Sequence, residues 1–192
     1  MTGWYHDHAL HITADNAYLG LAAFYLSTLK KTAGGCGEHW NLDNIEEREM
    51  MLADKVLDSA CQLFHDIQGA HKDDLYGDVN MVSGVPFPNM PMVAKTYRFR
   101  FLNAAVARPY LLQLKNERLQ DVGPRVCKVI ATDGGYRGTA VPFPSFGLLL
   151  GVAERYEVVC DFSSLAGQTL YWYNGKDDKN QKRVCHTFVT VT

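Results

Sequence analysis

Two histidines separated by one residue form the tripeptide His6-Asp7-His8 near the start of the chain. On an extended strand, alternate residues point to the same face and lie about 6.5 Å apart along the backbone. This spacing sets two imidazoles side by side, an arrangement that can give one nitrogen to each of two neighbouring metal ions. Imidazole is a suitable ligand for several transition metals. His6 and His8 are therefore the candidate metal ligands.

Other polar residues near the pair have weaker predicted roles. His11 follows three residues after His8, and a helical turn there would bring it close enough to act as a third ligand. Asp7 faces away from the two imidazoles, so we expect it to form a structural or supporting hydrogen bond. The remaining histidines in polar stretches are expected at the surface: His39, His65 and His71.

Composition limits the class of protein. The chain has 192 residues, enough for one full domain and part of another, with 47% hydrophobic and 21% charged residues. A net charge of -2 and a pI near 6.4 argue against nucleic acid or an anionic membrane as a partner. No apolar run approaches the ~20 residues of a membrane-spanning helix. No signal peptide is visible, which favours a cytoplasmic location.

The five cysteines are scattered and form no CxxC pair. Cys127 and Cys160 lie within apolar runs, where a small buried thiol is expected. The odd number and the lack of a regular spacing favour a reducing compartment over a disulfide framework.

Short strand-like runs separated by glycine and proline recur along the chain and predict an all-β sandwich or barrel. In the clearest run, Tyr97, Phe99 and Phe101 face one way. Arg98 and Arg100 face the other way, as expected for a half-exposed sheet. Further strands are predicted at 126–131, 156–162, 169–173 and 184–191.

The chain divides into three predicted parts. Residues 1–28 are too short for a domain and are expected to supply a strand or two with a short helix. Residues 29–48 are glycine-rich and charged and predict a linker, with one helical turn at 44–49. Residues 49–192 predict the β domain.

Several segments, taken in order, resemble the multicopper oxidases, and most closely their bilirubin-oxidase-like, laccase-like branch. Residues 4–9 and 16–25 resemble the end of that family's first cupredoxin domain, and residues 52–55 resemble the strand that opens the second domain. The later segments that match in order are 77–80, 82–88, 97–105, 132–135 and 153–163.

The resemblance implies a cupredoxin-like Greek-key sandwich at 49–192, with residues 1–28 as a short N-terminal appendage. It also implies copper as cofactor, with His6 and His8 matching the second HxH motif of the family, whose imidazoles bind two coppers, one each. The family's other copper-binding motifs are absent from this sequence. Cys185-His186 does not replace them, because neighbouring side chains on a strand point to opposite faces.

Three hypotheses for function follow. The first is a copper-binding oxidoreductase chain that cannot reduce oxygen alone and needs a complementary oxidase chain, with a small aromatic substrate. The second is a copper-free module used for binding or for assembly as a homo-oligomer through the apolar segment 19–26. The third is acid–base catalysis on an aromatic or polyketide-like molecule, in which Tyr5, His6, Asp7 and His8 are the polar candidates.

Overall fold

The larger sheet of the molecule is organised by the alternation of side chains along its central strand, β7 (Thr96–Asn103). In the computed structural model, which describes residues 1–27, 42–64, 75–175 and 186–191, the aromatic rings of this strand point into the core. The arginines point to the opposite face, as the sequence predicted. All five side chains from Tyr97 to Phe101 are buried, so both faces of β7 are covered.

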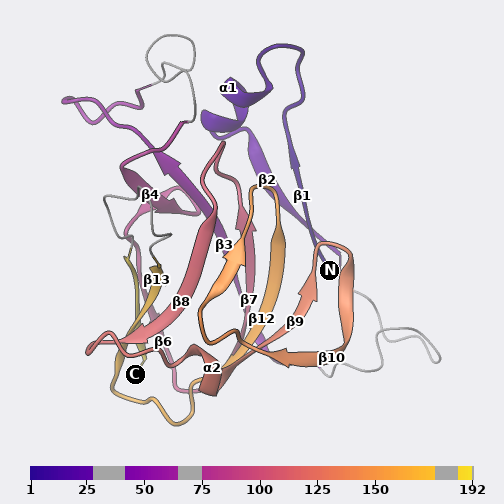
Figure 1. Cartoon of the computed structure of the whole chain (residues 1–192), viewed down its shortest axis with the longest axis vertical. Coiled ribbons are helices and arrows are strands. Elements are labelled where there is room, and N and C mark those ends of the chain that lie inside the picture. Colours follow the sequence, from indigo (N-terminus) through magenta and orange to yellow (C-terminus); the bar gives the residue numbers. More distant parts are fainter. Residues whose placement is uncertain (28–41, 65–74, 176–185, 192) are drawn as a thin grey trace.

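Seven strands form this sheet, in the order β10-β9-β12-β7-β3-β4-β5 (Figure 1). All neighbours are antiparallel except β3 and β7, which run parallel. The other strands are β3 (Glu46–Lys55), β4 (Val79–Val82), β5 (Val85–Pro86), β9 (Cys127–Thr132), β10 (Gly135–Pro142) and β12 (Arg155–Asp161).

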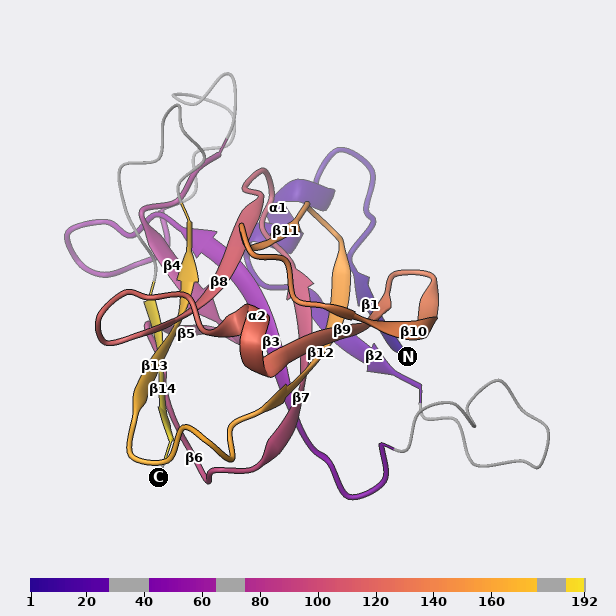
Figure 2. The same ribbon diagram turned by 60° about the horizontal axis from the view of Figure 1, so that its bottom comes forward.

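Five strands form the second sheet, in the order β11-β8-β13-β14-β6. They are β6 (Asn89–Met92), β8 (Tyr110–Asn116), β11 (Leu148–Leu150), β13 (Thr169–Asn174) and β14 (His186–Val191). The two sheets pack face to face, and α2 (Gly123–Val126) lies at one end of the sandwich (Figure 2). The predicted all-β sandwich is confirmed.

Aromatic rings fill the space between the sheets. Trp172 of β13 packs edge-on against Phe99 and Phe101 of β7, with ring centroids 5.4 and 4.9 Å apart. Edge-to-face pairs of this kind stabilise a core beyond the area they bury. The core therefore joins the two sheets through the face of β7 that carries its aromatic residues.

Residues 1–27 form a separate two-stranded hairpin with one helix, as predicted for this part of the chain. β1 (Thr2–His6) pairs antiparallel with β2 (Ala22–Leu26), and α1 (Thr13–Tyr18) lies between them at one end of the hairpin (Figure 1). The buried Tyr18 hydroxyl donates to the carbonyl oxygen of Phe64 and accepts from the amide of Val56. These bonds fix α1 to the segment after β3.

The start of the β domain differs from the prediction. β3 begins at Glu46, inside the predicted linker, so the helical turn expected at 44–49 is wrong. Parallel pairing with β7 draws these charged residues into the sheet, which local sequence preference does not reveal. His39, His65, His71 and Cys185 lie outside the described residues. No helix in the described ranges is long and apolar enough to cross a membrane.

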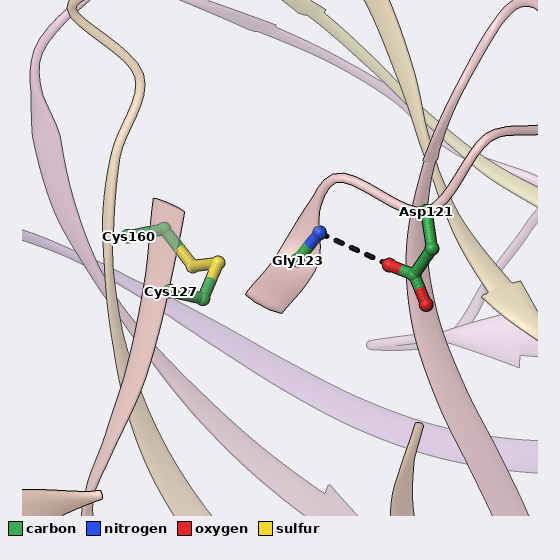
Figure 3. Close-up of a disulfide and its surroundings, with 4 residues drawn as sticks. All are labelled: Asp121, Gly123, Cys127 and Cys160. Carbon is green, nitrogen blue, oxygen red and sulfur yellow. Dashed lines mark hydrogen bonds between the residues drawn. A yellow bond between two sulfur atoms is a disulfide. The ribbon is translucent and has the colours of Figure 1, made fainter. Parts of the chain in front are cut away.

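Cys127 and Cys160 form a disulfide, so the prediction of two buried thiols is wrong (Figure 3). The two residues lie directly opposite each other on the antiparallel strands β9 and β12, with their Cα atoms 4.1 Å apart. Their positions in the sequence, 33 residues apart, do not show this register. The cysteine argument for a reducing compartment therefore no longer holds.

The disulfide should stabilise the sandwich because it restricts the unfolded chain. Replacing both Cys127 and Cys160 with alanine should lower the free energy of unfolding by about 2–4 kcal/mol, measured by urea denaturation. Cys61→Ala, which removes an exposed free thiol, is the matched control and should stay within about 0.5 kcal/mol of the wild type. Equal stability of the double variant and the control would contradict a stabilising disulfide.

Candidate functional site

The candidate metal ligands lie at the end of the N-terminal hairpin, where β1 terminates at His6. The rings of Trp4, His6 and His8 follow one another along one side of the chain. The Trp4 and His6 centroids are 4.6 Å apart, and those of His6 and His8 are 5.9 Å apart. This is the side-by-side arrangement of two imidazoles expected from the spacing.

A hydrogen bond sets the orientation of the His6 ring. Its Nδ1 lies 2.6 Å from the backbone oxygen of Asp7, so the tautomer protonated at Nδ1 donates to that carbonyl. The lone pair of Nε2 then remains available to a metal ion. A bond from the second ring nitrogen to a carbonyl oxygen is the usual way in which proteins orient a metal-binding histidine.

The Asp7 side chain stabilises the turn that follows β1. Its carboxylate accepts hydrogen bonds from the Asn16 side-chain amide at 2.8 Å and from the Ala9 backbone amide at 3.0 Å. These two bonds, with that from Asn16 the larger effect, hold the pKa of Asp7 below its ordinary value. The carboxylate therefore ties the loop carrying His8 to α1, in agreement with the structural role predicted for it.

His11 lies in a different environment from His6 and His8. It is exposed and has a backbone φ of 65°, in the turn before α1. Among the described residues, no three His, Cys, Asp or Glu side chains come together closely enough to hold a metal ion. The role of His11 as a third ligand stays a prediction.

A buried group of charges, which we call the arginine cluster, fixes the other end of β1. Its members are Thr2, Glu47, Arg98, Arg100 and Glu157. Arg100 donates to Thr2 Oγ1 at 2.7 Å and to Glu157 Oε1 at 2.8 Å, and the Thr2 hydroxyl donates to the same Glu157 oxygen at 2.7 Å. The hairpin is thus hydrogen-bonded to β7 and β12.

The expectation that Arg98 and Arg100 lie on a half-exposed face is wrong. Arg100 has no exposed surface and Arg98 is 4% exposed, because the hairpin covers this face of the sheet. Two carboxylates, Glu47 and Glu157, lie between the guanidinium groups and balance their charge. Sequence reasoning missed these partners, although two arginines on one strand face were a signal that acidic neighbours are needed if that face is covered.

The arginine cluster also shifts the titration of Glu47. Burial alone would raise the pKa of this carboxyl. The hydrogen bond from Arg100 and the charges of Arg98 and Arg100 outweigh burial and bring the pKa below 4.5. The Glu47 carboxylate is therefore charged at neutral pH, where it balances the charges of the two arginines.

The donor set of the pair suits copper in chemistry but is incomplete in number. Imidazole nitrogen is a good copper ligand, and the bond at His6 Nδ1 leaves Nε2 free. Two imidazoles leave most of the coordination positions of two metal ions to other ligands. His6 and His8 therefore fit copper in donor type, and by themselves they do not complete a copper site.

Comparison with known proteins finds relatives of this chain, although no protein-family model matches it. A bilirubin oxidase from Albifimbria verrucaria is 37% identical over 174 residues, which cover 88% of this chain and 28% of that protein. A laccase from Haloferax volcanii is 34% identical over 189 residues, which cover 92% of this chain and 30% of that protein.

A solved structure gives the same result. The McoA multicopper oxidase from the hyperthermophile Aquifex aeolicus superposes with a TM-score of 0.83 at 26% identity, and the match covers 100% of this chain and 41% of that one. The sandwich described above is therefore of the multicopper oxidase cupredoxin type. The chain spans about 30% of the length of the curated relatives it matches.

The arginine cluster predicts a specific acid sensitivity. A carboxyl whose pKa is lower in the folded than in the unfolded chain stabilises the fold above its unfolded pKa, and this contribution is lost as the pH falls through the folded pKa. The free energy of unfolding should therefore decline as the pH falls below 4.5, and Glu47→Gln should show a shallower decline.

Urea denaturation at a series of pH values measures this difference. Glu117→Gln is the control, because Glu117 is an exposed glutamate outside the arginine cluster, and it should follow the wild-type curve. If the wild type and Glu47→Gln lose stability in parallel, Glu47 does not contribute in this way.

Proposed function

Since the chain belongs to the multicopper oxidase family, we propose that it acts as the copper-binding part of an oxidase in which His6 and His8 bind two neighbouring copper ions, one each. Copper, when bound, supplies the electron transfer that reduces oxygen. Two histidines do not complete such a site, so oxygen reduction requires ligands from a complementary oxidase chain or from further sequence.

The observation that supports this proposal is the arrangement of the two imidazoles. Their centroids lie 5.9 Å apart, and the bond from His6 Nδ1 to the Asp7 carbonyl leaves Nε2 available. This separation allows one ion between the two rings or one ion at each ring, so the assignment of two ions rests on the family motif. The same positions match the family's second HxH motif.

The surrounding residues hold the two imidazoles in place. Asp7 fixes the turn between them through Asn16 and the Ala9 amide. The backbone amide of Asp7 donates to the Leu21 carbonyl at 3.0 Å, which continues the hairpin one step beyond His6. Preorganised ligands of this kind lose little conformational freedom when a metal binds.

The substrate and the partner chain are also part of the proposal. The relatives named above are a bilirubin oxidase and a laccase, which supports a small aromatic electron donor for the complete oxidase. Because this chain spans about 30% of their length, the donor site and the missing copper ligands belong to the assembled oxidase and not to this chain alone.

A second candidate function, self-assembly without copper, is favoured by the outer face of the hairpin. Tyr5 and Tyr25 are 62% and 67% exposed, and the neighbouring Leu10 and Leu21 are 84% and 57% exposed. Large apolar side chains gathered on one exposed element commonly mark an interaction surface. A homo-oligomer formed through this face is therefore the alternative to an oxidase subunit.

Copper binding tests the first proposal. The metal-free protein should bind copper in a competitive titration against a chromogenic chelator, and His6→Ala and His8→Ala should each weaken binding by roughly tenfold or more. Glu117→Gln, which changes an exposed carboxylate outside the hairpin, is the control and should bind as the wild type does. Binding that survives the double variant of His6 and His8 would place copper elsewhere and contradict the proposal. The protein alone should consume no oxygen with a phenolic donor.

Light scattering after size exclusion tests the second candidate. Self-assembly through the hairpin predicts an oligomer that Tyr5→Ser combined with Tyr25→Ser converts to a monomer, since these changes remove exposed apolar area. Phe146→Ser is the matched control, because Phe146 is 68% exposed and its backbone oxygen accepts from Gln113 of β8 in the other sheet, and it should leave the oligomer intact. A monomeric wild type would rule out this candidate.

A further inference from the structure

A cavity lies between the N-terminal hairpin and the outer face of the seven-stranded sheet. Its volume is about 410 Å³, within the range of small-molecule binding sites. The walls come from α1 and β2 on one side and from β3 and β4 on the other. Principal wall residues are Ala17, Ala22, Phe24, Met51, Ala53 and Met81.

The shape of this cavity follows from short side chains on facing elements. The alanines of α1, β2 and β3 leave the space between the hairpin and the sheet unfilled. Phe24 supplies an aromatic surface on the hairpin side, and Met51 and Met81 supply flexible thioethers on the sheet side. Methionine side chains adapt to ligands of irregular shape, and they make favourable contacts with aromatic rings.

Among the described residues that line this cavity, Lys55 is the one with a charged side chain. Its ammonium donates to the backbone oxygen of Tyr18 and lies 4.3 Å from the centroid of the Tyr18 ring. An ammonium has three N–H donors, so this carbonyl does not use them all. In the described part of the chain, no carboxylate forms an ion pair with Lys55.

Asp54, the acidic residue whose charge acts on Lys55, has other partners. Asp54 precedes Lys55 on β3 and points to the other face of the sheet, where it accepts from Arg108 at 2.6 Å and from the Gly77 amide at 2.6 Å. Burial lowers the pKa of Lys55, which the charge of Asp54 only partly offsets. An anion in the cavity would stabilise the charged form of Lys55 directly.

We propose that this cavity binds a small aromatic monoanion, with the anionic group on Lys55 and the apolar body between Phe24 and the two methionines. A single cation matches a single negative charge, and the apolar walls match an aromatic body. The volume accommodates a ligand of two fused rings. This site is separate from the proposed copper ligands and does not require copper.

Methionine methyl NMR on the metal-free protein tests the proposal, with 2-naphthoate as the probe. The methyl signals of Met51 and Met81 should shift on titration and saturate, while those of Met50 and Met92, which are 3% and 2% exposed in the core, stay in place. The neutral 2-naphthamide should bind roughly tenfold or more weakly, because it carries no negative charge to pair with the Lys55 ammonium. No shift at Met51 and Met81 would overturn the proposal.

Two variants locate the interaction. Lys55→Met removes the charge and keeps a side chain of similar length. It should weaken the binding of 2-naphthoate by roughly tenfold and leave the binding of 2-naphthamide unchanged. Ala53→Leu fills the cavity and should weaken both ligands. Lys128→Met, on the exposed side of β9, is the matched control and should bind as the wild type.

Unshifted Met50 and Met92 signals in each variant establish that the fold is intact. Equal binding of naphthoate and naphthamide, or unchanged binding in a folded Ala53→Leu, would contradict the proposal. Neither result bears on copper binding by His6 and His8, which the chelator titration measures separately.

Discussion

The buried pairing of Arg98 and Arg100 with Glu47 and Glu157 is the interaction on which the placement of the N-terminal hairpin depends. Two guanidinium groups buried on the outer face of β7 need counter-charges, because a buried charge without a partner is costly. The hairpin covers this face, and β3 and β12 supply the carboxylates. The Thr2 hydroxyl joins the two by bonding to Arg100 and Glu157.

This constraint links structure to function along β1. The arginine cluster fixes the strand at Thr2, pairing with β2 extends it, and His6 stands at its far end. The Asp7 carboxylate then bonds the turn after β1 to Asn16 of α1. The Tyr18 hydroxyl at the end of α1 bonds to the Val56 amide, just after β3. A hairpin of two strands is only marginally stable by itself, so these contacts are needed to hold the imidazoles still. The same arrangement leaves the cavity beside Lys55 open, because alanines line the facing surfaces.

Much of the fold could be predicted from the sequence because it depends on local alternation. The run from Tyr97 to Phe101 predicted its strand and the direction of its rings. The spacing of His6 and His8 likewise predicted two neighbouring imidazoles. Each of these features depends on residues only a few positions apart.

The features that the sequence did not reveal depend on register between distant strands. Cys127 meets Cys160 because β9 and β12 pair with those residues opposite, and Glu47 meets Arg98 because β3 runs beside β7. A helical turn at 44–49 was favoured by local composition and was overridden by this pairing. The burial of Arg98 and Arg100 could not be foreseen for the same reason, since the hairpin that covers them is far away in the sequence.

Amide hydrogen exchange in Thr2→Val shows whether the arginine cluster holds the histidine-bearing hairpin on the sheet. Valine keeps the shape of threonine and removes the hydroxyl that bonds to Arg100 and Glu157. Amides of β1 and β2 should exchange about tenfold faster in the variant, while those of β8 and β13 in the other sheet keep their wild-type rates. Unchanged exchange in β1 and β2 would contradict this role of the arginine cluster.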